Sequence, residues 1–398
     1  MTETTSPPAA PAALRPVIRF QPGRHKRFVA GHPWAYSNEI VLDAAARALP
    51  GGSLVSLCDA SGKRLGTGFF NPHTLMTVRR LDTAVDHPVD AGFFAHRLHQ
   101  ALTLRERLFP RPFYRLIHAE ADQMPGLVVD RFGPVVVIQS NSAGMERLLA
   151  PLCAALQTTL APETLIVRRD SPARLLEGLE VQPPEIIGRP PENPVPVDEN
   201  GLTFLADVHN GQKTGWFFDQ RDNRAFAATL AAGQQVLDLY SFQGGFALAC
   251  AQAGAASVLA VDRSAAALAL ARHAACRNGL AERCAFLQAD VFATLEQHQA
   301  AGARFGLVIA DPPAFVKSRK DLAAGLRGYR KLARLAAGVT APEGFLVMAS
   351  CSHNVEPALF AETVAHGLAD AGRSGRLLRQ AGAGADHPVH PFLPETAY

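Results

Sequence analysis

The stretch that decides the fold is "QQVLDLYSFQGGF", residues 234–246. An apolar run ends in an acid, Asp238, and Gly244 and Gly245 follow just before a second apolar run. This order predicts a buried strand, a tight loop and the start of a helix. The glycine spacing is not G-x-G-x-x-G, which disfavours a nicotinamide-dependent oxidoreductase.

Four further apolar runs follow, separated by segments with helical patterns. They are "SVLAVD" (257–262), "CAFLQAD" (284–290), "FGLVIAD" (305–311) and "FLVMAS" (345–350). Ser264 is expected to cap the helix after the first of these runs, and Asn278-Gly279 to end it. Strands that alternate with helices predict an α/β fold with a doubly wound parallel sheet from about residue 197 to residue 398.

The first three of these strands end in acids, Asp238, Asp262 and Asp290. One acid at a strand end means little, because helix N-termini attract acids. Three in series, at the sheet edge where ligands bind, indicate a site for S-adenosylmethionine. Asp238 and the glycine loop, which also contains Ser241, would face its sulfonium and amino-acid end. Asp262 would accept from the ribose hydroxyls, and Asp290 from the adenine amino group.

The last two strands end in groups that suit chemistry on a nucleobase. Asp311 begins "DPPAF", in which two prolines fix an extended backbone and keep a helix from starting. Cys351 lies in "MASCSHNV", residues 348–355. A thiolate that adds to C6 of cytosine makes C5 able to attack a methyl group, so methylation at C5 needs such a cysteine. Asp311 would bind N3 and the exocyclic amine of the same base.

Two other interpretations stay open. A free cysteine is more often a small buried hydrophobe than a reagent. The enzyme would then methylate a purine nitrogen, which needs no thiolate. Alternatively, the chain is a non-catalytic RNA-binding assembly factor that keeps the fold. No Cys-x-x-Cys pair occurs among the six cysteines, and none lies at zinc-site spacing with histidines, so we expect no metal.

The N-terminal block, residues 17–83, predicts a small β-rich barrel that binds RNA. Runs such as "SLVSLCD" (53–59) and "LMTVRRL" (75–81) are broken by glycines and Asn71-Pro72. Residues 15–83 hold ten Lys or Arg against four Asp or Glu, which indicates an anionic partner. Basic and aromatic side chains together suit phosphate contact and base stacking. The candidates are Arg24, Lys26, Arg27 and Trp34.

Between these blocks, residues 84–196 predict a central α+β domain. We expect helices at 91–109 and 144–160, a hairpin that turns near Gly133-Pro134, and a strand at "TLIVRR" (164–169). The proline-rich stretch 183–201 predicts a linker, and residues 1–16 a flexible tail. The chain has no apolar run long enough for a membrane span and no secretory signal, so we expect a soluble cytoplasmic protein.

With these motifs in place, the chain resembles the RlmI-type family of bacterial large-subunit rRNA cytosine-C5 methyltransferases. The resemblance rests on "HPWAYS", "DQMPGLVVDRFG", "KTGWFFDQRDNR", "YSFQGGF", "DPPAFVKSRKDL", "RGYR", "SCS" and "ADHPV". It implies an N-terminal PUA domain, a central α+β domain and a class I methyltransferase domain. It also implies that Cys351 is the nucleophile, and that Asp311 and the strand-end acids and glycines lie in the target and cofactor motifs.

Weaker site candidates follow from the same reasoning. By the resemblance, "KTGWFFDQR" closes over the methyl donor, so Gln220 and Arg221 are further cofactor-binding candidates. The alternative for Arg221 is an ion pair between segments. Lys317 and Arg327 would extend the grip on large-subunit rRNA beside the target pocket, with a solvated loop as the alternative. A homodimer is left open.

Overall fold

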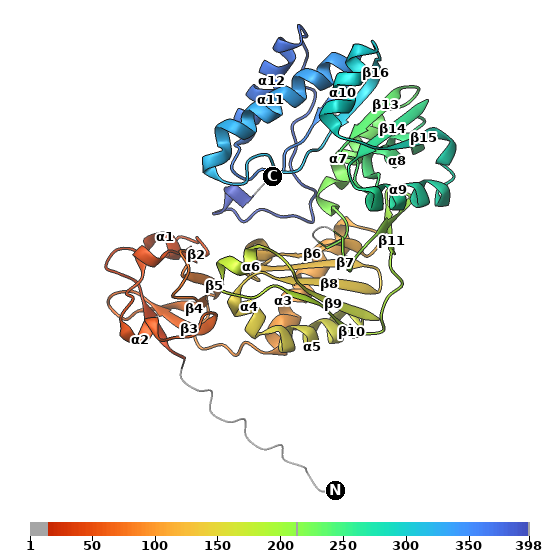
Figure 1. Cartoon of the computed structure of the whole chain (residues 1–398). Coiled ribbons are helices and arrows are strands. Elements are labelled where there is room, and N and C mark those ends of the chain that lie inside the picture. Colours follow the sequence, from red (N-terminus) through yellow and green to blue (C-terminus); the bar gives the residue numbers. More distant parts are fainter. Residues whose placement is uncertain (1–14, 212–213, 397–398) are drawn as a thin grey trace, which may run out of the picture. The chain divides into compact units, whose positions relative to one another are not determined.

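The computed structural model describes residues 15–211 and 214–396. Of the expected flexible tail, residues 1–16, the part up to residue 14 lies outside the described residues. The chain forms two compact units, each discontinuous in sequence (Figure 1). The first unit comprises residues up to 104 together with 116–129 and 138–186. The second unit comprises residues 105–115 and 130–137 and everything from 187 onward.

The N-terminal strands form a five-stranded sheet, as the sequence predicts. Its order is β1 (Val17–Arg19), β3 (Ser53–Cys58), β4 (Arg64–Phe70), β5 (Val78–Asp82) and β2 (Trp34–Ala35). Two short helices, α1 (Lys26–Val29) and α2 (Ala44–Arg47), complete this part. Phe20, Phe28 and Phe70 are among the buried side chains of its core. The strand predicted at 75–81 begins only at Val78, because a turn precedes it in which Asn71 N–H donates to the carbonyl of Thr77.

The middle sheet also has five strands, and here the sequence-based boundaries need correction. Its order is β10 (Gln182–Gly188), β9 (Thr164–Arg169), β8 (Val135–Ser140), β7 (Leu127–Phe132) and β6 (Phe113–His118). Its helices are α3 (Ala91–Leu108), α4 (Ala143–Arg147), α5 (Leu149–Leu160) and α6 (Ala173–Leu176). The single helix predicted at 144–160 is therefore two helices that meet at Leu148.

The proline-rich stretch 183–201 is more ordered than the predicted linker. Its first part lies in β10, and its second part is β11 (Val195–Glu199), which pairs antiparallel with β12 (Leu202–Ala206). Pro183 and Pro184 are tolerated because β10 is an edge strand, where one side makes no ladder hydrogen bonds. The division between the two units, at Ile186 and Ile187, falls inside this stretch, although the stretch itself is largely strand.

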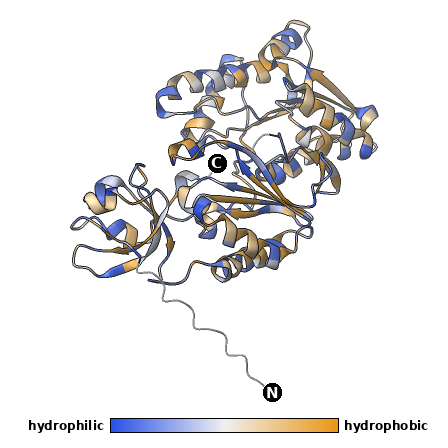
Figure 2. Ribbon diagram, turned by 60° about the horizontal axis from the view of Figure 1, so that its bottom comes forward, coloured by the Kyte–Doolittle hydropathy of each residue, from blue (hydrophilic) through white to orange (hydrophobic). Residues whose placement is uncertain are grey.

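The C-terminal sheet is the doubly wound parallel sheet that the sequence predicts. Its order is β15 (Cys284–Gln288), β14 (Ser257–Asp262), β13 (Gln235–Leu239), β16 (Phe305–Ala310) and β17 (Thr340–Met348), all parallel. Hydrophobic residues lie along its strands (Figure 2). The strand order reverses between β13 and β16, which is where ligands of such sheets bind.

Helices connect these strands and carry part of the site. They are α7 (Arg221–Thr229), α8 (Gly245–Gln252), α9 (Ala265–Arg277), α10 (Val291–Ala300), α11 (Leu322–Val339) and α12 (Pro357–Asp370). Ser264 caps α9 as expected, since its hydroxyl accepts from the N–H of Ala267. Within the described part of the chain, residues 371–396 contain no strand.

A buried ion network stabilises the first unit. The guanidinium of Arg79 on β5 donates to Glu120 at 2.8 Å and to Glu177 at 2.9 Å. Burial alone would lower the pKa of Arg79, but the two carboxylates outweigh burial and raise it. The indole N–H of Trp34 donates to the same Glu120 oxygen, and the amide of Asn71 donates to Glu177. Arg79 thus pairs with two carboxylates, Glu120 and Glu177, that lie far from it in the sequence.

The substitution Arg79→Ala is expected to lower the free energy of unfolding by about 3 kcal/mol, because it leaves two buried carboxylates without their cation. Urea denaturation followed by circular dichroism measures the loss. The matched control is Arg64→Ala, which removes an arginine from an exposed pair with Asp86 on the same sheet. An equal shift in both variants would show that the buried network has no special weight.

Candidate active site

The strand register brings three of the expected residues, Asp238, Asp311 and Cys351, to one edge of the C-terminal sheet. Asp238 on β13 lies in register with Ile309 on β16, and Ala310 pairs with Met348 on β17. Asp311 follows immediately, and its N–H donates to the carbonyl of Leu239 at 3.4 Å. Beyond β17, the thiol of Cys351 lies 3.8 Å from the carbonyl oxygen of Pro312, which it meets as a donor. The thiol and the Asp-Pro-Pro segment are therefore neighbours.

The loop after β13 is held in a strained backbone conformation. Tyr240 and Phe242 have φ angles of +60° and +49°, a region that side chains disfavour, and Gly244 follows at +78°. The N–H of Ser241 donates to the carbonyl of Val261, and the N–H of Phe242 donates to the carboxylate of Asp262 at 2.9 Å. Such strain persists where surrounding contacts determine it, and it clusters at ligand sites.

Asp238 is the most perturbed group at this edge. Its side chain is buried, and one carboxylate oxygen accepts from the N–H of Ala247 at 2.9 Å. The other oxygen, and the hydroxyl of Ser241, find no hydrogen-bond partner among the described residues. Burial raises the pKa of Asp238 well above its ordinary value, and the nearby negative charges of Asp311 and Asp262 raise it further. Such a pair of polar atoms suits a cationic ligand with N–H donors, as the sulfonium and ammonium of S-adenosylmethionine provide.

Asp262 and Asp290 both support the backbone around this edge. The two oxygens of Asp262 accept from the N–H groups of Phe242 and Ser264, so this carboxylate holds two loops. Asp290 is the N-cap of α10, where it accepts from the N–H of Ala293, and it forms an ion pair with Arg263. The hydrogen bond from Ala293 is the first cause that lowers the pKa of Asp290. Asp290 thus caps a helix, which is the alternative role of an acid that lies at a strand end and precedes a helix.

The two glycines are required by packing within the protein. A Cβ atom on Gly244 would lie 2.8 Å from Leu248 and 3.0 Å from Ala271 on α9. A Cβ atom on Gly245 would lie 2.9 Å from the side chain of Arg224. Their small size lets α8 begin directly against α9 and α7, and this close packing fixes where the loop can meet a ligand.

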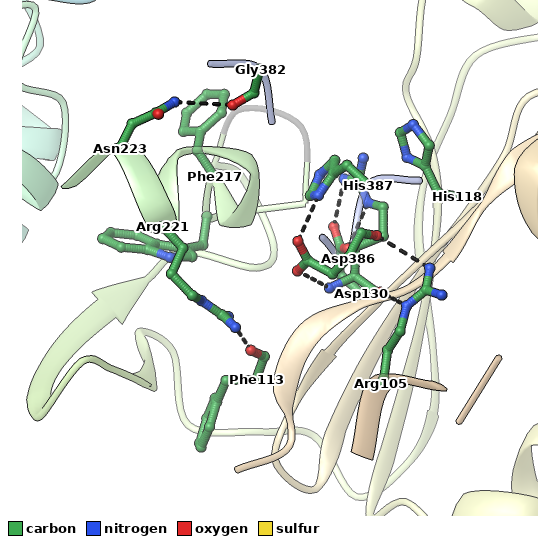
Figure 3. Close-up of polar contacts among 12 residues, drawn as sticks. Arg105, Phe113, His118, Asp130, Phe217, Arg221, Asn223, Gly382, Asp386 and His387 are labelled. Carbon is green, nitrogen blue, oxygen red and sulfur yellow. Dashed lines mark hydrogen bonds and ion pairs between the residues drawn. The ribbon is translucent and has the colours of Figure 1, made fainter. Parts of the chain in front are cut away.

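The segment 214–224, which includes the candidates Gln220 and Arg221, makes several hydrogen bonds and ion pairs with other parts of the chain. The side chain of Gln220 accepts from the amide of Asn223. Arg221 donates to the carbonyl of Phe113 (Figure 3). Its guanidinium also lies 3.6 Å from the carboxylate of Glu199 and 4.4 Å from the ring centroid of Phe109. The ion pair between segments, considered as the alternative for Arg221, is therefore present.

Around the same segment lies a buried network to which the sequence assigned no role. Glu199 accepts from both Arg224 and the indole of Trp216. The ring of Phe217 meets that of Phe242 edge-on at 5.1 Å, which joins this segment to the strained loop after β13. Side chains far apart in sequence thus hold the segment against the C-terminal sheet.

The "ADHPV" motif, residues 385–389, anchors the C-terminal stretch in the second unit. The carboxylate of Asp386 accepts from the backbone N–H of Arg115 at 3.0 Å, and its carbonyl accepts from Arg105 (Figure 3). Arg115 in turn forms a two-pronged pair with buried Asp130. The N–H of Gly384 donates to the carbonyl of Asp219, so this stretch also holds the 214–224 segment.

The environment of Cys351 differs from that of the other cysteines. Burial raises the pKa of Cys153 and of Cys284 to about 11, and it raises the pKa of Cys58 and Cys250 as well. These thiols are held in the neutral, unreactive form. Cys276 is exposed on α9, whereas Cys351 is half-buried at the sheet edge. Cys351 combines partial access with a position beside the Asp-Pro-Pro segment.

The RNA-binding candidates divide into free cations and residues with internal partners. Arg24, Lys26, Lys317 and Arg327 are exposed. Arg27 pairs with Glu39 at 2.9 Å. The indole of Trp34 is already bonded to Glu120, so its N–H serves the first unit, although the ring is partly accessible.

In the described ranges, no three His, Cys, Asp or Glu side chains gather as metal ligands would. No helix in the part of the chain that the structure covers is long and apolar enough to cross a membrane.

Comparisons with known proteins agree with this geometry. Residues 18–83 match a PUA-like domain, and residues 181–376 match an S-adenosylmethionine-dependent methyltransferase domain. A Streptococcus mutans protein described as a SAM-dependent methyltransferase has the same fold, with a TM-score of 0.81, 19% identity, and coverage of 96% of this chain and 98% of that one. A similar methyltransferase structure, with a TM-score of 0.81 and 18% identity over 97% of this chain and 98% of its own, was solved in complex with SAH.

Curated relatives extend the match over nearly the whole chain. Ribosomal RNA large subunit methyltransferase I of Erwinia tasmaniensis is 36% identical, over 94% of this chain and 96% of its own length. The Salmonella arizonae protein of the same name is 35% identical, over 100% of this chain and 98% of its own. At this identity and coverage, the chain belongs to the ribosomal RNA large subunit methyltransferase I family, S-adenosylmethionine-dependent methyltransferases with an N-terminal PUA-like domain.

Proposed function

We propose that this protein methylates C5 of a cytosine in large-subunit (23S) rRNA, in the cytoplasm, through a covalent adduct on Cys351. The family supports rRNA as the substrate, since its named members are large-subunit rRNA methyltransferases. The observation that carries the choice of atom is the position of Cys351. Its half-buried thiol lies beside the Asp-Pro-Pro segment, in the loop that follows β17, and β17 pairs with β16, the strand that Asp311 follows.

The methyl donor would be held by the groups that lack an internal partner. The free oxygen of Asp238 and the hydroxyl of Ser241 would receive its ammonium group, at the start of α8. The donor supplies a methyl group on a positively charged sulfur, and the negative charges of Asp238 and Asp311 favour that cation. Asp262 keeps spare lone pairs for the ribose hydroxyls. Asp290 would accept from the adenine amino group in addition to capping α10, while Gln220 and Arg221 would support the covering segment.

Cys351 and Asp311 would divide the chemistry on the base. The thiolate of Cys351 adds to C6 of cytosine, a C–S bond forms, and electron density moves to C5. Asp311 binds the protonated N3 and the exocyclic amine, which stabilises that density. C5 then takes the methyl group from the sulfonium, which becomes a neutral thioether. A base removes the C5 proton, the C5–C6 double bond is restored, and the thiolate leaves.

RNA would be gripped through its phosphates by exposed cations. Arg24 and Lys26 in the N-terminal domain, residues 17–83, carry no internal ion pair in the structure and suit phosphate contact. Arg27 and the face of Trp34 would add a partly neutralised cation and a stacking surface. Lys317 and Arg327 lie exposed on the loop after Asp311 and on α11, where they would hold the flanking strand while the target base is turned out.

The substitution Cys351→Ala is expected to reduce methyl transfer to rRNA by roughly 10⁴-fold or more, since it removes the nucleophile. The rate is measured with radiolabelled S-adenosylmethionine, and Cys276→Ala, which removes an exposed thiol on α9, should retain the full rate. Wild-type protein should also become covalently trapped on RNA that contains 5-fluorocytosine, because fluorine cannot leave C5 as a proton does. Full turnover by Cys351→Ala would instead support a purine-nitrogen target.

The substitution Asp238→Asn is expected to stabilise the ligand-free protein and to weaken its affinity for S-adenosylmethionine. The folded-state pKa of Asp238 is raised, so ionising it costs stability above its unfolded pKa, and a neutral amide avoids that cost. The gain in melting temperature over wild type should therefore shrink as the pH falls from 7.5 to 5. Titration calorimetry should show affinity for S-adenosylmethionine reduced by about 10- to 100-fold. Unchanged affinity would remove Asp238 from the donor site.

Bisulfite sequencing of large-subunit rRNA would identify the target. One cytosine should be protected from conversion in cells that contain the protein and unprotected in cells that lack it. Complementation with Cys351→Ala should leave that cytosine unprotected, whereas complementation with Cys276→Ala should protect it. Identical maps with and without the protein would contradict methylation at C5 of this RNA.

A further inference from the structure

Tyr329 occupies an unusual place beside the proposed nucleophile. It lies on α11 and is wholly buried. Its hydroxyl is 2.9 Å from the hydroxyl of Ser350 and 2.8 Å from that of Ser352, the two residues that flank Cys351. One phenol thus contacts both neighbours of the cysteine and lies behind it in the protein interior.

The hydrogen bonds around Tyr329 can be satisfied in one consistent pattern. A phenol has one proton to donate and two lone pairs to accept with. Ser350 donates to Tyr329, and Tyr329 can then donate to Ser352. The N–H of Ser352 donates back to the hydroxyl of Ser350 at 3.2 Å, which closes a ring around the Cys351 backbone. A closed ring of this kind leaves the cysteine little freedom to turn.

The same ring also holds the segment that follows Asp311. The N–H of Val316 donates to the hydroxyl of Ser352 at 3.2 Å, and the N–H of Phe315 lies 3.5 Å from the Tyr329 oxygen. Both bonds come from the loop that continues the Asp-Pro-Pro segment. The loop that carries the cysteine and the loop that carries the acid are therefore tied to one side chain.

Packing fixes the phenol ring itself. The ring of Tyr329 contacts the ring of Phe315 at 4.7 Å and the ring of Phe360 on α12 at 5.2 Å. One turn before Tyr329, a Cβ atom on Gly325 would lie 2.3 Å from Val316 and 2.8 Å from the carbonyl of Phe315. The glycine lets the loop lie directly on α11, within reach of the tyrosine hydroxyl.

We propose that Tyr329 is a positioning residue that sets the Cys351 thiol relative to the base bound at Asp311. It would act through Ser350, Ser352 and the 315–316 backbone, without contact to the reacting atoms. This inference rests on the proposed function, because it takes Cys351 as the nucleophile. An attacking sulfur misplaced by about 1 Å is enough to slow a reaction by roughly 10²-fold.

The test is Tyr329→Phe, which removes one oxygen and keeps the ring. We expect kcat for rRNA methylation, and the rate of trapping on 5-fluorocytosine RNA, to fall together by about 10- to 100-fold. KM for rRNA and the affinity for S-adenosylmethionine by calorimetry should stay within about twofold of wild type, since Tyr329 lies outside both binding surfaces. The matched control is Tyr114→Phe, which removes another buried tyrosine hydroxyl, one bonded to Arg131; it should keep wild-type rates.

A second variant covers the case in which Tyr329→Phe does not fold. Ser350→Ala breaks the ring from its surface side and should lower the trapping rate in the same direction. The double variant Ser350→Ala/Tyr329→Phe should lose less than the product of the two single losses, because both act on one ring.

The outcomes separate this inference from the function on which it rests. If wild-type protein is trapped but folded Tyr329→Phe or Ser350→Ala is trapped at the wild-type rate, the positioning role is wrong and Cys351 remains the nucleophile. A loss confined to KM or to melting temperature would make Tyr329 a purely structural residue. If wild-type protein is not trapped at all, the covalent mechanism fails, and the role of Tyr329 fails with it.

Discussion

The hydrogen-bond register between β13 and β16 determines where Asp238 and Asp311 lie relative to each other. It sets Asp238 level with Ile309, so that Asp311 emerges next to a carboxylate that is already buried. Burial is the main cause that raises the pKa of Asp238, and the nearby negative charges of Asp311 and Asp262 raise it further. A cation bound between Asp238 and Asp311 relieves both penalties at once. This edge of the sheet therefore favours positive charge, which is consistent with the proposed position of the methyl sulfonium.

The three acids at the strand ends look alike in sequence but have different hydrogen-bond partners in the structure. Both oxygens of Asp262 accept hydrogen bonds from backbone N–H groups. One of these bonds holds the loop in which Tyr240 and Phe242 have left-handed conformations. Asp290, which follows the edge strand β15, is a helix cap with an arginine partner. Of the three acids predicted at strand ends, Asp238 alone retains an oxygen without a partner among the described residues. Position on the sheet edge is shared by all three, and what distinguishes them is the number of N–H groups that each one meets.

Much of the fold follows from the sequence, because apolar runs that end in acids repeat at strand–helix spacing and because parallel strands bring their ends together. The parts that could not be predicted depend on partners distant in the chain. Nothing in "RGYR" indicates that Tyr329 meets two serines more than twenty residues later. Arg221 carries a charge that suits a ligand, yet Phe113 and Glu199, each from another segment, hold it. From the sequence alone, the prolines of β10 favour a linker. The sequence does not show that β10 lies at the edge of its sheet, where proline is tolerated.

The attachment of Asp386 to Arg105 and Arg115 bears on how the protein is made. These contacts join residues more than 270 positions apart and lie in the same unit as the methyltransferase sheet. During synthesis, the strands at 113–115 and 130–132 therefore leave the ribosome long before the carboxylate that completes their surroundings. The hydrogen bonds of Asp386 can therefore form only after nearly the whole chain has been translated. A fragment that begins at residue 197 would lack Arg105 and Arg115, the two arginines to which Asp386 is bonded, and would leave this aspartate without those contacts.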